Sequence, residues 1–428
     1  MRSARSIAGV FILVSLLSAC AAATVPSSTI APSPSGAAAA SDPHSAAPTR
    51  SSRPRASASV EAPSPTPSVT PLPTPEAPLI AVREPADWSK PVTIADGECW
   101  SVAVTIDDRG RYHIAARCDE EIHYLRWYPD AVDRHGDVFP PPSDRVELGP
   151  QLALDGAELL MAYSRLAQED GGCGDDGLRD LGVYVRTRPD ETDTWSKPYR
   201  VGEVGDSLQS FRAVDGVLHL TVQTPDGAVL YESLRDGATT RVPIPHAKTT
   251  SLRVGDDGHA RVAYSTGHEI RLARVDGRSI DSRVIASSDE TNLSSPAMVL
   301  GPGDLPVIVW TQNVDGGGGC AGPEPGPLDG TYLATEIHGT WQSERISKST
   351  GSTSVTLDPA TGRWHAIIDE PMLGLRYITT KGEGSLSRET LPDSRGFNSA
   401  VIRIDPEDGR LAVVAASYDD GIVVATKP

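Results

Sequence analysis

The segment SLRVGDDGHARVAYSTGHEIRLAR, residues 251–274, contains the pattern on which the fold depends. Apolar and polar residues alternate on both sides of Asp-Asp-Gly, which is the signature of a β-hairpin turn. A third alternating run, EIRLAR, follows a short loop that contains glycine. The segment therefore predicts three consecutive antiparallel strands.

The three-strand plan recurs along the chain at spacings of 41 to 59 residues. The repeated segments begin at Ser101, Gln151, Ser210, Ser251, Pro296, Ser354 and Ala400. A fourth strand follows in some of them, as in DTWSKPYRV at residues 193–201. Four-stranded units that repeat every ~40–50 residues are typical of β-propellers. The sequence thus predicts an all-β fold, a seven-bladed β-propeller over residues 79–428.

The last unit ends after its third strand, GIVVAT, so its fourth strand must come from elsewhere. ADWSKPVTI, at residues 86–94, closely matches the fourth strand DTWSKPYRV of the second unit. We therefore expect residues 86–94 to complete the last blade, closing the ring and removing an exposed sheet edge.

These repeats resemble the BNR/Asp-box, sialidase-like β-propeller superfamily. The second strands GRYHIAA and GHARVAY carry part of the resemblance, and RPDETDTW at residues 188–195 carries the rest. In the latter, Asp190, Thr194 and Trp195 match the Asp-box S-x-D-x-G-x-T-W. Thr192 stands where the Asp-box has glycine.

The resemblance implies a glycoside hydrolase whose three arginines surround a substrate carboxylate, beside a Tyr–Glu nucleophile pair and an acid. Arg212, Arg253 and Arg403 fall in predicted innermost strands near the channel. The Arg-Ile-Pro motif that begins the catalytic propeller of that family is absent. The arginines therefore have two interpretations, as ligand-binding groups or as partners of surrounding acids.

The N-terminus resembles a bacterial lipoprotein signal. Arg2 and Arg5 precede a short apolar run that ends at Leu-Ser-Ala-Cys20, similar to a lipobox. The resemblance implies acylation of Cys20, cleavage of residues 1–20, and attachment to the cell membrane on its extracytoplasmic face. The alternative is an ordinary secretory signal. Residues 21–78, rich in Ala, Ser, Thr and Pro, are predicted to form a disordered tether.

The composition disfavours nucleic acid as a partner. The chain of 428 residues has 39 Lys plus Arg against 57 Asp plus Glu, a formal net charge of −18. Residues 79–428 carry 34 of those basic and 54 of those acidic residues, hence −20. This balance disfavours nucleic acid, whose phosphates require clustered Lys and Arg.

Four cysteines remain besides Cys20. Cys99 and Cys118 lie at the open ends of one predicted hairpin, within disulfide reach. Cys173 and Cys320 lie in two long Gly-rich loops between second and third strands. We expect them to form a second disulfide that straps the ligand-facing side, with metal ligation as the alternative.

Acidic pairs follow several second strands, among them Asp369-Glu370 and Asp419-Asp420. All are predicted to lie on one face of the ring. That face could hold Ca²⁺, attract a basic partner, or be a solvated surface. The same two pairs are also candidates for paired-carboxylate hydrolysis. No cofactor is required by any motif.

Histidines and tryptophans recur at repeat positions. His113, His219 and His365 occupy one position in three units, which indicates packing rather than catalysis. Trp88, Trp195 and Trp341 open outermost strands and are expected to pin blade to blade. Trp100, Trp310 and Trp364 lie in or beside inner strands and are expected in the core. Trp100 and Trp127 are the candidates for stacking on a sugar ring.

Together these patterns predict a monomeric, membrane-anchored extracytoplasmic lipoprotein whose propeller binds a protein or glycan partner. The alternative function is that of a sialidase-like glycoside hydrolase with a diverged active site. The signatures of the commonest motif-bearing enzymes, such as a nucleophile elbow or a Walker loop, are absent from the sequence.

Overall fold

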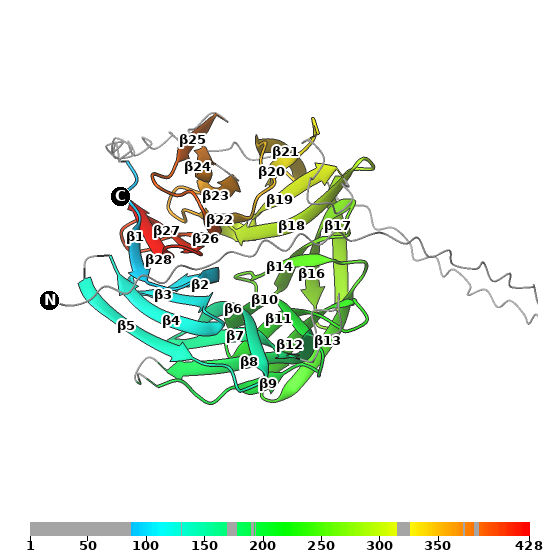
Figure 1. Ribbon diagram of the computed structural model, residues 1–428. Coiled ribbons are helices and arrows are strands. Elements are labelled where there is room, and N and C mark those ends of the chain that lie inside the picture. The colour runs from blue at the N-terminus through cyan, green and yellow to red at the C-terminus, as the bar shows by residue number, and fades with distance from the viewer. Residues whose placement is uncertain are drawn as a thin grey trace, which may run out of the picture. The chain divides into compact units, whose positions relative to one another are not determined.

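The computed structural model describes residues 87–428, apart from 130, 169–177, 190–191, 193, 315–325, 371–372 and 381–384. The signal, the tether, Cys20, Cys173 and Cys320 lie outside the described residues. Within the described part of the chain, 28 strands form seven four-stranded antiparallel sheets. The chain is a seven-bladed β-propeller, as predicted (Figure 1). No helix among the described residues is long and apolar enough to cross a membrane.

Each blade is named here by its order in the chain. Blade 1 comprises β2 (Cys99–Ile106), β3 (Tyr112–Cys118), β4 (Glu121–Tyr128) and β5 (Ala131–Phe139). Blade 2 comprises β6 (Arg145–Asp155), β7 (Glu158–Gln168), β8 (Leu178–Pro189) and β9 (Tyr199–Val201). Blade 3 comprises β10 (Ser207–Val214), β11 (Val217–Gln223), β12 (Val229–Arg235) and β13 (Ala238–Ile244). Blade 4 comprises β14 (Thr249–Val254), β15 (Ala260–Ser265), β16 (Glu269–Asp276) and β17 (Ser279–Ser287).

The remaining blades follow the same plan. Blade 5 comprises β18 (Thr291–Leu300), β19 (Pro306–Val314), β20 (Gly330–Ile337) and β21 (Thr340–Ser347), with the 3₁₀ turn η1 (Pro302–Asp304) between its first two strands. Blade 6 comprises β22 (Thr353–Leu357), β23 (Trp364–Glu370), β24 (Gly374–Thr380) and β25 (Leu386–Thr390). Blade 7 comprises β26 (Phe397–Ile404), β27 (Leu411–Ser417), β28 (Gly421–Lys427) and β1 (Val92–Ala95).

The ring closes through the displaced N-terminal strand. β1 pairs antiparallel with β28, with Val92 opposite Val424, and Ser89 N donates to Thr426 O at 2.8 Å. In Figure 1 the blue β1 lies beside the red strands of blade 7. The innermost strands of neighbouring blades also contact one another all round, including β26 with β2. The predicted closure of the ring by residues 86–94 is thus confirmed. The observed strand β1 ends one residue later, at Ala95.

Apolar side chains between neighbouring blades form the core. One cluster joins Tyr112 and Ile114 of blade 1 to Ala412 and Val414 of blade 7. Trp88, just before β1, is buried edge-on against Tyr377 of blade 6. The predicted role of such tryptophans, pinning one blade to the next, is confirmed at this position.

The three recurring histidines all pack in the same way. The Nδ1 atoms of His113, His219 and His365 lie 2.6–2.7 Å from the hydroxyl oxygen of a tyrosine on the next strand of the same blade. Each histidine is buried. The interpretation of this repeated position as packing is confirmed.

One predicted disulfide lies within the described residues. Cys99 and Cys118 are opposite each other in the β2–β3 ladder and form the bond, with their Cα atoms 4.1 Å apart. The predicted partnership of Cys173 with Cys320 stays a prediction.

Candidate functional site

The alternating strand directions give the ring two distinct faces. Each innermost strand ends at a hairpin turn, such as residues 107–111 and 405–410. We call the face of the ring formed by these turns the first-turn face. Turns between second and third strands, such as residues 418–420, lie at the opposite ends of the blades, on the second-turn face. The register confirms this division, because Arg403 pairs with Ala412 near one turn and Phe397 with Ser417 near the other.

A cavity of 590 Å³ opens where innermost strands reach the first-turn face. A second cavity of 430 Å³ shares several lining residues with it, including Arg253, Arg403 and Thr105, and adds Arg212. The two cavities therefore form one space in the channel between the blades. We call this space the arginine cavity.

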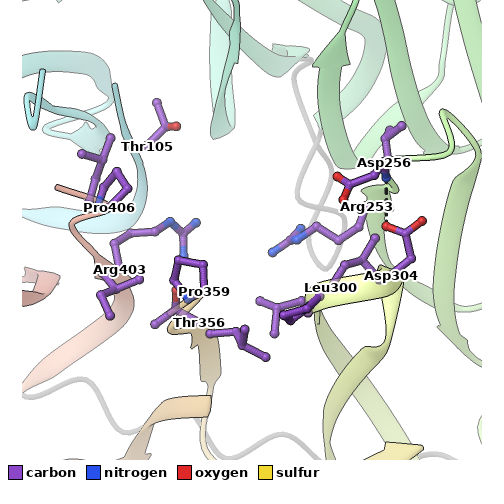
Figure 2. A pocket seen from close by; sticks show the side chains of 16 residues that line it. Thr105, Arg253, Asp256, Leu300, Asp304, Thr356, Pro359, Arg403 and Pro406 are labelled. Carbon is purple, nitrogen blue, oxygen red and sulfur yellow. Dashed lines mark hydrogen bonds between the residues drawn. The ribbon is translucent and has the colours of Figure 1, made fainter. Parts of the chain in front are cut away.

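The arginines reach the cavity because of strand alternation. Arg212, Arg253 and Arg403 lie near the ends of β10, β14 and β26. Each follows a fully buried apolar residue of the same strand: Phe211, Leu252 and Ile402. Since successive side chains point to opposite sides of a strand, burying the first directs the second away from that core. In Figure 2 the guanidinium groups of Arg253 and Arg403 point toward each other across the cavity.

These arginines hydrogen-bond to main-chain carbonyls. The Nη1 atoms of Arg212, Arg253 and Arg403 donate to the carbonyl of the preceding residue, at 2.6, 2.8 and 2.8 Å. Arg403 Nε also donates to Val104 O at 2.9 Å. Within the part of the chain that the structure describes, none of the three has a carboxylate oxygen within 4.0 Å. The three arginines therefore form no ion pair with an acidic side chain among the described residues.

Burial makes the positive charge costly. It lowers the pKa of Arg212 to about 9, with a further contribution from the nearby charge of Arg403. It also lowers the pKa of Arg403 to about 10. Both groups stay positive at neutral pH. The cavity therefore holds partly dehydrated cations that have no anionic partner among the described residues.

The cavity walls are mostly apolar. They include Ile106, Val254, Leu300, Leu357 and Ile404. Three prolines, at positions 302, 359 and 406, also line the cavity.

Two aspartates also line the cavity. Asp304 Oδ1 accepts a hydrogen bond from Asp256 N at 2.9 Å, drawn as the dashed line in Figure 2. Its Oδ2 is 3.0 Å from Arg261 Nη2. The Asp304 carboxylate is thus engaged by its own surroundings rather than by the channel arginines.

The structure does not bring the predicted acidic pairs to the arginines. Asp369 and Glu370 end β23, and Asp419 and Asp420 lie between β27 and β28, so all four are on the second-turn face. Glu370 Oε2 lies 2.8 Å from Arg376 Nη2, and burial raises the pKa of Asp369. Among the described residues no group of three or more His, Cys, Asp or Glu could hold a metal ion.

The two candidate stacking tryptophans differ in exposure. Trp127 is half-buried and packs edge-on against Tyr112 at 5.1 Å between ring centroids. Trp100 is 48% exposed and meets the exposed Tyr418 edge-on at 4.6 Å. The sequence identified Trp100 as a candidate but gave no signal for its contact with Tyr418, 318 residues away.

A further polar cluster lies on the first-turn face of blade 1. Asp107 accepts hydrogen bonds from Arg111 N at 2.9 Å and from Arg111 Nε, and its Oδ2 lies 3.1 Å from His113 Nε2. Burial would raise the pKa of Asp107, but these hydrogen bonds hold it well below its usual value. The cluster was not predicted, although the turn sequence IDDRGRYH contains all three residues.

Comparison with known proteins supports the fold. No protein-family model and no curated protein sequence matches the chain. Among solved structures, it is similar to the BP39L lectin from Burkholderia pseudomallei, at 11% identity and a TM-score of 0.54, over 77% of this chain and 96% of that chain. It is also similar to virginiamycin B lyase from Staphylococcus aureus, at 10% identity and a TM-score of 0.53, over 79% and 99%. An α-L-arabinanase from Penicillium chrysogenum matches at 12% identity and a TM-score of 0.47, over 79% and 98%. The similarity to the lectin and to the lyase, at such identities, shows the β-propeller fold alone.

Proposed function

We propose that this protein is a lipid-anchored extracytoplasmic binding protein, and that its partner, a protein or a glycan, places an anionic group in the arginine cavity. One observation carries the proposal: Arg212, Arg253 and Arg403 line one space without a carboxylate partner among the described residues. A carboxylate, sulfate or phosphate group would form charge-assisted hydrogen bonds with the guanidinium groups.

The size and lining of the cavity fit a ligand-binding site. Its 590 Å³ is within the ~300–1,000 Å³ typical of small-molecule pockets. Apolar walls with a few convergent polar groups are also typical of such pockets. The cavity would therefore accept the end group of a larger partner, with Leu300 and Leu357 packing against its apolar parts.

Binding is favoured over hydrolysis by the positions of the carboxyl groups. A glycosidase needs two carboxyl groups about 5–9.5 Å apart on either side of the scissile bond. In the cavity, Asp304 is bonded to Asp256 N and Arg261. The carboxyl groups whose pKa is raised by burial, Asp180, Glu232 and Asp369, do not line it.

The proposed anchor rests on Cys20 and the apolar run before it. Changing Cys20→Ser should abolish incorporation of labelled palmitate and move the protein from the detergent phase to the aqueous phase of a Triton X-114 extraction. Retention of the variant in the detergent phase would contradict the lipid anchor.

The arginine cavity is tested by calorimetric titration with oligogalacturonate and, as the neutral match, oligogalactose. A second pair of probes is a peptide with a free C-terminal carboxylate and the same peptide amidated. The Arg253→Gln/Arg403→Gln double variant should lose binding of the anionic probe at least tenfold. Arg278→Gln/Arg395→Gln is the matched control, because it removes the same charge from two exposed arginines. Equal affinity of both double variants, or failure of both anionic probes to bind the wild type, would refute the site.

A further inference from the structure

A second surface, at the opposite end of β2 from the arginine cavity, carries an exposed aromatic pair. Trp100 is 48% exposed and Tyr418 is 42% exposed, and their rings meet at 86° with centroids 4.6 Å apart. Trp100 is the most exposed tryptophan among the described residues. Tryptophan and tyrosine, together with arginine, are the residues most enriched among those that dominate binding at the centres of protein interfaces.

A β-bulge explains why Trp100 faces outward. In blades 1, 3 and 7 the innermost strand has one extra residue near its start, at Trp100, Gln209 and Asn398. A bulge redirects the side chain of the extra residue. Gln209 Nε2 donates to Lys248 O at 2.9 Å, and Asn398 Nδ2 to Cys99 O at 3.4 Å, so both of these amides join neighbouring blades. Trp100 stands at the equivalent position of blade 1, and its ring is exposed instead.

The aromatic pair is held in place by its surroundings. Trp100 follows Cys99, whose disulfide to Cys118 ties β2 to β3. The guanidinium of Arg117 lies 5.9 Å from the centroid of the Trp100 ring. Tyr418 begins the tight turn in which Asp419 N and Asp420 N both donate to Ser417 Oγ. A surface fixed in this way loses little conformational entropy when a partner binds.

The charge around the pair indicates what it binds. The segments that carry or adjoin the rings, residues 96–100, 117–121 and 418–421, contain one basic residue, Arg117. They contain seven acidic residues: Asp96, Glu98, Asp119, Glu120, Glu121, Asp419 and Asp420. Aromatic faces attract cations, as the position of Arg117 over Trp100 illustrates. Acidic surroundings also favour a cationic partner by charge complementarity.

We propose that Trp100 and Tyr418 form the centre of a docking surface for a basic segment of a partner protein, with an arginine or lysine side chain stacked on the rings and neighbouring basic residues facing the carboxylates of Asp419 and Asp420. This surface is distinct from the arginine cavity. Trp100 and Ile106, which lines the cavity, are six residues apart on β2, about 20 Å along the strand. The proposal therefore does not depend on the proposed function of the cavity.

The probe is a fluorescently labelled peptide, acetyl-(Gly-Arg)₄-amide, followed by fluorescence anisotropy. Its matched control replaces each arginine by citrulline, which keeps the shape and removes the charge. The full chain should bind the arginine peptide, more weakly as salt increases, and should not bind the citrulline peptide. Absence of binding to the arginine peptide, or equal binding of both peptides, overturns the proposal.

Variants locate the binding surface. Trp100→Ala should raise the dissociation constant at least tenfold and Tyr418→Ala three- to tenfold, while Trp100→Phe should retain most of the affinity. Tyr199→Ala is the control, because Tyr199 is a tyrosine of similar exposure, 43%, on blade 2. Arg253→Gln/Arg403→Gln should leave peptide binding unchanged, which separates this surface from the arginine cavity.

Two results would reassign the surface. If Trp100→Ala binds the peptide as the wild type does while Asp419→Asn/Asp420→Asn loses binding, the attraction is electrostatic alone and the aromatic docking surface is refuted. If a neutral chitotriose, rather than the arginine peptide, binds in a Trp100-dependent way, the pair is a glycan site and the basic segment is refuted.

Discussion

The two faces of the ring use the same strands for opposite chemistry. At the ends of the innermost strands, Arg253 and Arg403 surround a cavity with apolar walls. At the start of β2, Trp100 meets Tyr418 amid acidic turns. The repeat thus fixes where a strand begins and ends, whereas the residue at each end decides what that face can bind.

The two faces differ in the regularity of the strands that reach them: β14 is regular near the first-turn face, whereas β2 has a bulge near the second-turn face. Near the first-turn face the innermost strands alternate without interruption, so Leu252 is buried and Arg253 faces the channel. Near the second-turn face β2 has a bulge, and alternation no longer decides the direction of Trp100. The side chains presented at the first-turn face therefore follow from strand alternation, and the exposure of Trp100 at the second-turn face accompanies a break in that alternation.

Removal of the closing strand should disrupt both faces at once. Deleting residues 79–95 removes β1, the partner of β28, together with the buried side chains of Trp88 and Ile94. Blade 7 carries Arg403 toward one face and Tyr418 toward the other, and its sheet would end in an exposed edge. We expect loss of the cooperative thermal transition measured by circular dichroism, with aggregation. A deletion of residues 21–78 is the control, and it should melt as the wild type does. Cooperative melting of the first variant at the wild-type temperature would show that β1 is dispensable.

Acid should destabilise the whole fold through two buried histidines, His219 and His365. Burial lowers the pKa of His219 and of His365 to about 4, from an ordinary value near 6.5. Both are neutral in the folded protein, whereas the unfolded chain takes up protons as the pH falls below about 6.5. Stability is therefore lost between about pH 6.5 and pH 4, and rises with pH across that window. At pH 5 the loss is on the order of 2 kcal/mol for each histidine.

The measurement is urea unfolding at pH 7.5, 6 and 5. His219→Phe/His365→Phe should flatten the dependence of unfolding free energy on pH, whatever its effect at pH 7.5. His246→Phe, which changes an exposed histidine, is the control and should retain the wild-type slope. A double variant with an undiminished slope would place the acid sensitivity elsewhere.

Removing the disulfide should affect the second-turn face more than the first. Cys99 and Cys118 are separated by 19 positions, and closing a loop of that size stabilises a fold by about 3 kcal/mol on the chain-entropy model. Cys99→Ala/Cys118→Ala should lower the unfolding free energy by about that amount. It should also weaken arginine-peptide binding at Trp100 while leaving oligogalacturonate binding at Arg253 unchanged. Equal losses at the two faces would mean that the bond acts on the whole ring rather than on its neighbour Trp100.

The parts of the fold that were predictable depend on local or pairwise chemistry. Asp/Gly turns and alternation identify the hairpins, and the match between residues 86–94 and 193–201 identifies the closing strand. The Cys99–Cys118 bond follows from antiparallel register once the hairpin is known. Each of these features can be recognised within one repeat or between two similar ones.

The site was less predictable because it depends on contacts between blades. The sequence places Arg403 near the channel but does not reveal whether an acid lies beside it. Asp405, two residues later, is committed to its own turn, where its Oδ1 accepts from Glu407 N at 2.9 Å. The contact of Tyr418 with Trp100 crosses the seam where blade 7 meets blade 1. No pattern within a repeat specifies that pair.

The smallest expected effect is the change in unfolding free energy on Arg403→Met, and the sign of that change distinguishes two roles of Arg403. Arg403 is half-buried, donates to Val104 O and Ile402 O, and has no carboxylate within 4.0 Å in the described part of the chain. A buried charge without an opposite charge costs free energy, which an apolar side chain of similar length would not. Arg403→Met should therefore raise the unfolding free energy by about 1 kcal/mol while abolishing anion binding. Arg278→Met, at an exposed arginine, should change stability by less than ~0.5 kcal/mol and leave binding intact.

If Arg403→Met instead destabilises the protein, its hydrogen bonds to the two carbonyls outweigh the cost of the unpaired charge. Arg403 would then be a structural link between blades 7 and 1, and only Arg212 and Arg253 would remain as ligand-binding arginines.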